Sequence, residues 1–173
     1  MPEVTPQDFD VDAWLDDAER PARSVTVYQK SGLIADLDRL AEQIKNADDD
    51  IEEVDGPSAG GSASGKLRAE YAKLAKQFHD SALIIRVEGR DTHERIKIAD
   101  GVKDIGMKDA AVLADAITSP KFTPEQVIRL VEKIGGAQAG LIVERFNEAS
   151  EAIPTVSADF LPKPSTPDDG GES

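Results

Sequence analysis

The chain has 173 residues, no cysteine, and a formal net charge of -14 from 20 Lys and Arg against 34 Asp and Glu. The lack of cysteine excludes disulfides, thiolate nucleophiles and Cys-ligated zinc, and the negative charge disfavours binding to nucleic acid or to an anionic membrane. A hydrophobic share of 39%, with only 5% aromatic residues, is enough for a folded core built mainly from Leu, Ile, Val and Ala.

The first segment, residues 1–19, is acidic and is expected to be flexible. It lacks the apolar region of a signal peptide, and no apolar run in the chain reaches membrane-spanning length, so we expect a cytoplasmic protein without a membrane partner. Within it, Ala13–Glu19 is compatible with a short helix. Trp14 is the only tryptophan, and we expect it to dock on the core because a Trp side chain buries a large area.

Residues 20–89 have a palindromic pattern of strand, helix, linker, helix and strand. Ser24–Tyr28 alternates apolar and polar residues as a half-buried strand does, and Ala82–Val87 is a second β-type run. The two helical segments between them are amphipathic, with apolar residues at Leu33, Leu37, Leu40 and Ile44 in the first and at Leu67, Tyr71, Leu74 and Phe78 in the second. The pattern predicts an antiparallel helical hairpin closed by two short paired strands.

The two helices are joined by a Gly/Ser-rich stretch, and residues 54–65 are predicted to be a flexible linker. Its run Gly60–Lys66 is similar to a phosphate-binding P-loop, but Leu67 replaces the hydroxyl residue that reaches magnesium, and no buried strand precedes the run. The acidic run Asp48–Glu53 lacks the ligand spacing of a calcium loop. We therefore expect neither a cofactor nor a metal here.

Residues 90–152 are predicted to form a C-terminal helical module. Asp91 is a plausible cap for the first of its helices, and Thr123 with Gln126 forms a capping box before another. Ser119-Pro120 is expected to end the alanine-rich helix. The four predicted helices are Asp91–Lys103, Asp109–Thr118, Pro124–Ile134 and Ala137–Ala149.

No constellation of catalytic residues is apparent. His79 and His93 have no partner in an HExxH arrangement and no nucleophile paired with them by motif, so the chain is not expected to be an enzyme. Residues 153–173 are rich in Pro, Ser and Asp and are predicted to be a disordered tail. Inside it, Phe160 and Leu161 are typical of a short motif that docks into a partner's groove; the alternative is that they fold back onto their own domain.

The order of these segments resembles that of the tail assembly chaperones of actinobacterial long-tailed phages and prophages. Three stretches carry the resemblance and together cover most of the chain: Arg20–Leu40 with the helix and strand that follow, Ala114–Leu130, and Ala137–Glu148 leading into the tail. These stretches contain capping and periodicity patterns rather than catalytic signatures. The resemblance therefore implies a mostly α-helical, non-enzymatic protein.

The resemblance further implies a protein that binds the tape measure or tail-tube proteins during tail assembly in the host bacterial cytoplasm. The candidate partner-binding residues are Leu141, Phe146, Phe160 and Leu161. Two alternatives stay open: a structural subunit of a tail or head–tail connector, and an acidic mimic of DNA. The second ranks lower, because the charges are scattered over every segment. Whether the chain forms a homo-oligomer also stays open.

Overall fold

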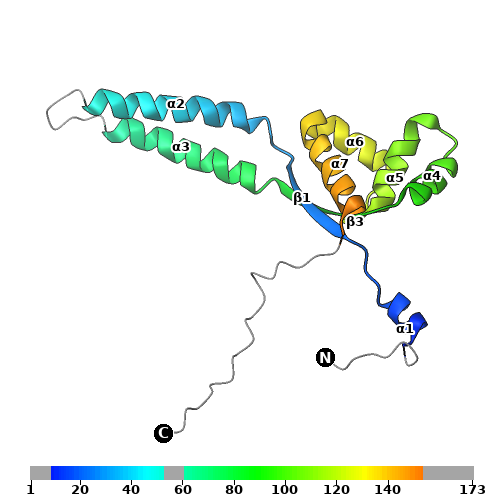
Figure 1. Cartoon of the computed structure of the whole chain (residues 1–173). Coiled ribbons are helices and arrows are strands. Elements are labelled where there is room, and N and C mark those ends of the chain that lie inside the picture. The colour runs from blue at the N-terminus through cyan, green and yellow to red at the C-terminus, as the bar shows by residue number, and fades with distance from the viewer. Residues whose placement is uncertain (1–8, 53–60, 154–173) are drawn as a thin grey trace, which may run out of the picture.

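A computed structural model describes residues 9–52 and 61–153 of the chain. The fold is mostly helical with one small antiparallel sheet, as the sequence predicts. In Figure 1 the helical hairpin projects to one side of the sheet, and α4–α7 gather on the other. The elements in chain order are α1 (Val11–Asp16), β1 (Ala22–Tyr28), α2 (Leu33–Glu52), α3 (Gly61–His79), β2 (Ala82–Glu88), α4 (Thr92–Asp100), the 3-10 turn η1 (Ile105–Met107), α5 (Lys108–Ala116), β3 (Ile117–Ser119), α6 (Pro124–Ile134) and α7 (Gly136–Glu151).

The two predicted strands pair along their whole length. β1 runs antiparallel to β2, from Ala22 opposite Glu88 to Tyr28 opposite Ala82, so the strands do close the hairpin. A third strand, β3, follows β2 in the sheet and pairs with it only around Arg86 and Val87. The sheet order is therefore β1-β2-β3.

The prediction of a helix continuing to Thr118 is wrong. α5 ends at Ala116, and Ile117–Ser119 forms β3 instead. The β-branched pair Ile117-Thr118 favours an extended backbone, and Pro120 disfavours a helical conformation at the residue before it. Ile117 is fully buried as a result and fills the core from the sheet rather than from a helix.

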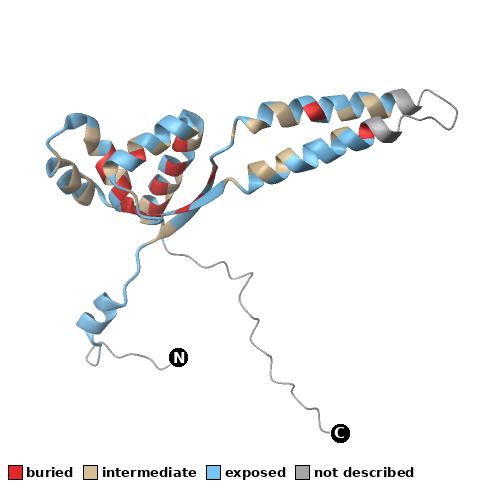
Figure 2. Ribbon diagram, turned by 180° about the vertical axis from the view of Figure 1, so that it is seen from behind, coloured by how far each residue is buried: buried red, intermediate tan, exposed pale blue. Residues whose placement is uncertain are grey.

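One face of the sheet and three helices share the main core. Val25 and Val27 of β1, Ile85 and Val87 of β2 and Ile117 of β3 contribute from the sheet, and α5, α6 and α7 supply the rest of the cluster. The residues at alternate positions, Ser24, Thr26, Ile84 and Arg86, are exposed on the opposite face. Figure 2 shows the buried residues concentrated where the helices meet the sheet. Helices of residues 90–152 thus pack on strands of residues 20–89.

The hairpin helices α2 and α3 lie side by side and antiparallel, as predicted (Figure 1). α3 begins at Gly61, so the last five residues of the predicted linker are helical; residues 54–60 lie outside the described residues. The side chains near this end account for the longer helix. The Ser64 hydroxyl donates to Asp48 Oδ1 at 2.9 Å, and Arg68 forms an ion pair with the same carboxylate, so contacts with α2 stabilise the first turns of α3.

The helix caps predicted for α4 and α6 are confirmed. Thr123 Oγ1 accepts from the Gln126 N–H at 3.2 Å, and Gln126 Oε1 accepts from the Thr123 N–H at 2.9 Å. Asp91 and Glu94 form the same reciprocal pair at the start of α4, at 2.8 and 3.1 Å. Both helices therefore begin where the sequence places them, to within one residue.

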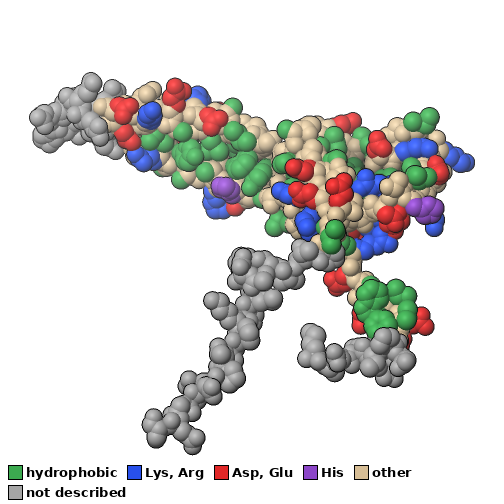
Figure 3. Space-filling view, in the orientation of Figure 1, with side chains coloured by type: hydrophobic (Ala, Val, Ile, Leu, Met, Phe, Trp, Pro, Cys, Tyr) green, Lys and Arg blue, Asp and Glu red, His purple; other side chains and the backbone are tan. Residues whose placement is uncertain are grey.

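The prediction that Trp14 docks on the core is wrong. Its side chain is 58% exposed on α1, which extends away from the sheet, and its aromatic neighbour is Phe9, with ring centroids 6.2 Å apart. Figure 3 shows hydrophobic side chains gathered on this short helix. The adjacent carboxylates of Asp12 and Asp16 oppose docking, because burial would strip them of water.

Candidate protein-binding grooves

The helices α4, α5, α6 and α7 enclose a groove of about 690 Å³, called here the four-helix groove. Three large apolar side chains on its walls are exposed: Ile96 at 54%, Val131 at 37% and Val143 at 44%. The other apolar side chains that line it are Ala99, Ala110, Val112, Leu113, Val127, Ile128 and Phe146. Its volume lies within the range of clefts that bind ligands.

Local sequence explains why the groove exists. α5 is rich in alanine, and its small Ala110 side chain lies on the lining of the groove, where a larger residue would fill the space. α6 carries Val127, Ile128 and Val131 on the groove side; Val127 belongs to the core and Ile128 packs against it, so Val131 is the exposed member of the three. The helices therefore approach closely at the sheet and leave apolar surface uncovered between them.

Arg95 of α4 bridges two walls of the groove. Its guanidinium carbon lies 4.3 Å from the centroid of the Phe146 ring on α7, within the range of a cation–π contact. Its Nε donates to the Arg90 carbonyl oxygen at 3.1 Å, and this hydrogen bond holds the side chain in its orientation. The contact links α4 to α7 at this point of the lining.

Arg90 fastens the loop before α4 to α5. Its Nε donates to Asp115 Oδ2 at 2.7 Å, and its Nη2 donates to the Asp115 carbonyl oxygen at 3.0 Å; Glu88 lies 3.5 Å away. Burial by itself lowers the pKa of Arg90, but the hydrogen bonds and negative charges of Asp115 and Glu88 outweigh it, so the pKa is raised. This arrangement is structural and holds the α4 wall in place.

The sequence-based candidates fall in different environments. Phe146 is only 5% exposed and belongs to the core, with one part of its side chain on the groove lining. Leu141 is 42% exposed on α7 and lies outside the lining of the groove. Phe160 and Leu161 lie outside the described residues. Of the two described candidates, only Phe146 lines the groove, and the role of all four in binding stays a prediction.

The sequence analysis did not identify Ile96, Val131 and Val143 as candidate partner-binding residues. A signal for the last was present, because α7 contains the run Leu141-Ile142-Val143, and three consecutive apolar residues cannot all face one core. Ile142 is the buried member, at 1% exposure, which leaves its two neighbours on opposite sides of it. Val143 lines the groove.

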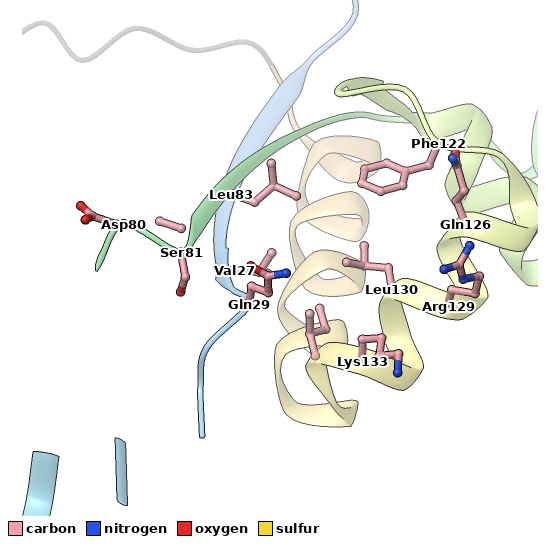
Figure 4. A pocket seen from close by; sticks show the side chains of 12 residues that line it. Val27, Gln29, Asp80, Ser81, Leu83, Phe122, Gln126, Arg129, Leu130 and Lys133 are labelled. Carbon is pink, nitrogen blue, oxygen red and sulfur yellow. The ribbon is translucent and has the colours of Figure 1, made fainter. Parts of the chain in front are cut away.

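A second groove of about 510 Å³ lies between the sheet and α6, and is called here the β2-edge groove. In Figure 4 Leu83 and Val27 on the strands face Phe122 and Leu130 across it. The side of α6 that lines it also carries two cations, Arg129 and Lys133. Asp80 also lines the groove, so its apolar interior is flanked by charges of both signs.

Neither groove contains an arrangement typical of catalysis. Within residues 9–52 and 61–153, no three or more His, Cys, Asp or Glu side chains lie so that they could hold a metal ion. His79 lies beside Tyr28 and Phe78, with ring centroids 6.4 and 5.5 Å away, and lines neither groove.

None of the helices described is long and apolar enough to cross a membrane. Comparisons with protein families, with curated proteins and with solved structures found no match.

Proposed function

We propose that this protein is a non-enzymatic tail assembly chaperone of a long-tailed phage, acting in the host bacterial cytoplasm on tape measure or tail-tube proteins. The observation that carries the proposal is the four-helix groove, where Ile96, Val131 and Val143 leave apolar surface uncovered. Uncovered apolar surface of this kind is typical of sites that bind other proteins. The resemblance of the segment order supplies the class of client.

The groove is suited to one apolar stripe of an amphipathic client helix. Such a helix presents side chains at i, i+3, i+4 and i+7, and a groove between helices receives them in one row. Fully burying each large apolar side chain contributes about 1.5–3 kcal/mol, and association costs about 4–15 kcal/mol, so binding requires several such anchors. The chain's charge of -14 favours a client whose polar face is basic and keeps the complex soluble.

Co-expression with the tail proteins encoded beside this chain tests the proposal. We expect the chaperone to raise the soluble yield of its client and to form a complex visible by native mass spectrometry. Val143→Asp places a carboxylate on the groove lining and should weaken the complex, because client binding would have to remove water from that carboxylate.

Leu141→Asp is the matched control, on the same helix and at nearly the same exposure, 42% against 44% for Val143, but outside the groove. It should leave the complex intact. Loss of the complex with Leu141→Asp alone would place binding on another face of α7 and reject the groove. Stoichiometric amounts of the protein in purified particles would favour a structural subunit instead.

A further inference from the structure

The short helix α1 has an uncovered apolar face. Val11, Trp14 and Leu15 stand at positions i, i+3 and i+4, so they share one side of the helix, and each is between 55 and 58% exposed. Phe9 adds to this side, since its ring centroid lies 6.2 Å from that of Trp14. No residue of α1 is buried. Exposed anchors at this spacing are those by which a helix docks on another protein.

Carboxylates flank the apolar face of α1 on both sides. Residues 9–19 contain five Asp and Glu residues and no Lys or Arg. At about 100° per residue, Asp12 and Asp16 lie on one flank of the face and Asp17 on the other. None of the three forms an ion pair within residues 9–52 and 61–153. A partner that covers this face must therefore place positive charge around an apolar strip.

An ion pair holds the segment after α1 beside α4. Arg20 Nη1 lies 2.6 Å from Glu94 Oε1 in the first turn of α4. Two later residues of the same helix, Ile96 and Ala99, line the four-helix groove. In Figure 1 α1 extends to the side of the sheet where α4–α7 gather, away from the hairpin. α1 is thus tethered to a helix that forms one wall of the groove.

The tether is long enough for α1 to reach the mouth of the groove. The three residues from Asp17 to Arg20 span up to about 10 Å, and α1 itself adds about 9 Å. Ile96 and Ala99 lie about 200° and 140° around α4 from Glu94, so α1 has to pass a helix about 10 Å wide. Its total reach of about 20 Å is sufficient for this.

We propose that α1 binds the same client helix that occupies the four-helix groove, with Val11, Trp14 and Leu15 against apolar side chains of the client. The acidic flanks of α1 bind Lys and Arg of the client. This inference rests on the proposed function and adds the chemistry of the client: a helix whose apolar stripe is bordered by basic residues. A client held in the groove lies within reach of α1, so the second contact forms at a high effective concentration.

The charges around the groove favour a basic client over α1 itself as the occupant of the groove. Asp109 and Glu132 lie on the groove lining, and the acidic α1 would meet like charges there. Arg95, a cation of the lining, already lies over the Phe146 ring. A basic helix between the groove and α1 instead faces carboxylates on both sides, which stabilises the three-part arrangement.

The fluorescence of Trp14 tests this proposal in the full chain, because it is the only tryptophan. The probe is a purified helical segment of the tape measure protein, with any tryptophan of its own replaced by phenylalanine. When the segment binds, Trp14 emission should move to shorter wavelength, and its quenching by acrylamide should fall at least about twofold. Trp14→Ala should weaken binding about tenfold or more. Ile34→Ala, at an exposed hairpin position outside α1 and the groove, should not weaken it.

Salt dependence tests the charge of the client. The triple variant Asp12→Asn, Asp16→Asn and Asp17→Asn keeps the apolar face of α1 and removes its flanking charges. It should bind the segment more weakly than the wild type at low salt and lose less affinity as salt rises, because salt screens the attraction that the variant lacks. The same salt dependence in both proteins would overturn the basic client.

The outcomes separate this proposal from the proposed function. If the segment shifts the methyl resonances of Ile96, Val131 and Val143 but leaves Trp14 emission unchanged, the groove binds the client and the role of α1 is rejected. If nothing binds, both are rejected. Protected Trp14 emission before the segment is added would also overturn the proposal. It would assign the α1 face to the chain's own surface or, where the protection rises with protein concentration, to a second copy.

Discussion

Gln138 of α7 and Tyr28 of β1 exchange two hydrogen bonds across 110 residues of sequence. Gln138 Oε1 accepts from the Tyr28 N–H at 2.7 Å, and Gln138 Nε2 donates to the Tyr28 carbonyl at 3.0 Å. The Tyr28 ring in turn stacks on Phe78 of α3, with centroids 4.2 Å apart. One side chain thus fastens the last helix to the strand end from which the hairpin projects, and joins the two halves of the molecule.

Replacing Gln138 should destabilise the fold markedly. Gln138→Ala leaves the Tyr28 N–H and carbonyl without partners in a half-buried site, and we expect a loss of about 2–3 kcal/mol in the free energy of unfolding. Gln43→Ala, at an exposed helix position, should change it by less than about 0.5 kcal/mol. Urea unfolding measures both, and equal values would contradict a special role for Gln138.

Replacing Gly89 or Gly140 by alanine should change the stability of the fold in opposite directions. A Cβ on Gly89 would clash with the Ala149 carbonyl oxygen, so Gly89→Ala must push α7 off the sheet and should cost more than about 3 kcal/mol. Gly140 lies within α7 and a Cβ there would meet nothing within 4 Å, so Gly140→Ala should stabilise by about 0.5–1 kcal/mol. Thermal unfolding of both variants checks the pair, and stabilisation by Gly89→Ala would refute the packing described.

Glu94 should make stability depend on acid pH. The hydrogen bond from Arg20, followed by the Asp91 backbone N–H, lowers the pKa of Glu94 below its ordinary value of 4.5. A lowered folded-state pKa gives stability that is present above the unfolded pKa and is lost as pH falls through the folded one. We expect the wild type to exceed Glu94→Gln by up to about 1 kcal/mol near pH 6, with the advantage shrinking in acid. Parallel stability curves from pH 6 to 3 would contradict this.

Trp14 should report an exposed environment. Since it is the only tryptophan and is 58% exposed, its fluorescence should be red-shifted and readily quenched by acrylamide. Trp14→Ala should change stability by less than about 0.5 kcal/mol, whereas Phe146→Ala in the core should cost about 3–5 kcal/mol. A blue-shifted, protected emission would show that α1 docks.

The sequence predicted the parts of this fold that local rules control. The cap at Asp91, the capping box at Thr123, the alternation in β1 and the apolar stripes of the hairpin depend on neighbouring residues, and the sequence indicated all of them. β3 depends on an edge of β2 that comes from a distant part of the chain, so Ile117 could not be placed by periodicity. The Gln138–Tyr28 pair is equally non-local.

The grooves were less predictable than the fold. Hydrophobic periodicity shows which residues are apolar but not which of them neighbouring helices will cover. Phe146 and Val143 are both apolar residues of α7, yet one is 5% and the other 44% exposed, because the sheet, α5 and α6 pack against only part of the helix. Binding surfaces emerge from the spaces between elements, which the sequence alone does not reveal.

A methyl NMR titration of the full chain with a purified helical segment of the tape measure protein tests the central claim most directly. Binding in the four-helix groove predicts shifts in the methyl resonances of Ile96, Val131 and Val143, with Leu141 and Ile84 unchanged although they are similarly exposed. Shifts confined to Leu141, Ile84 or the hairpin, or no shifts at saturating concentrations of the segment, would contradict it.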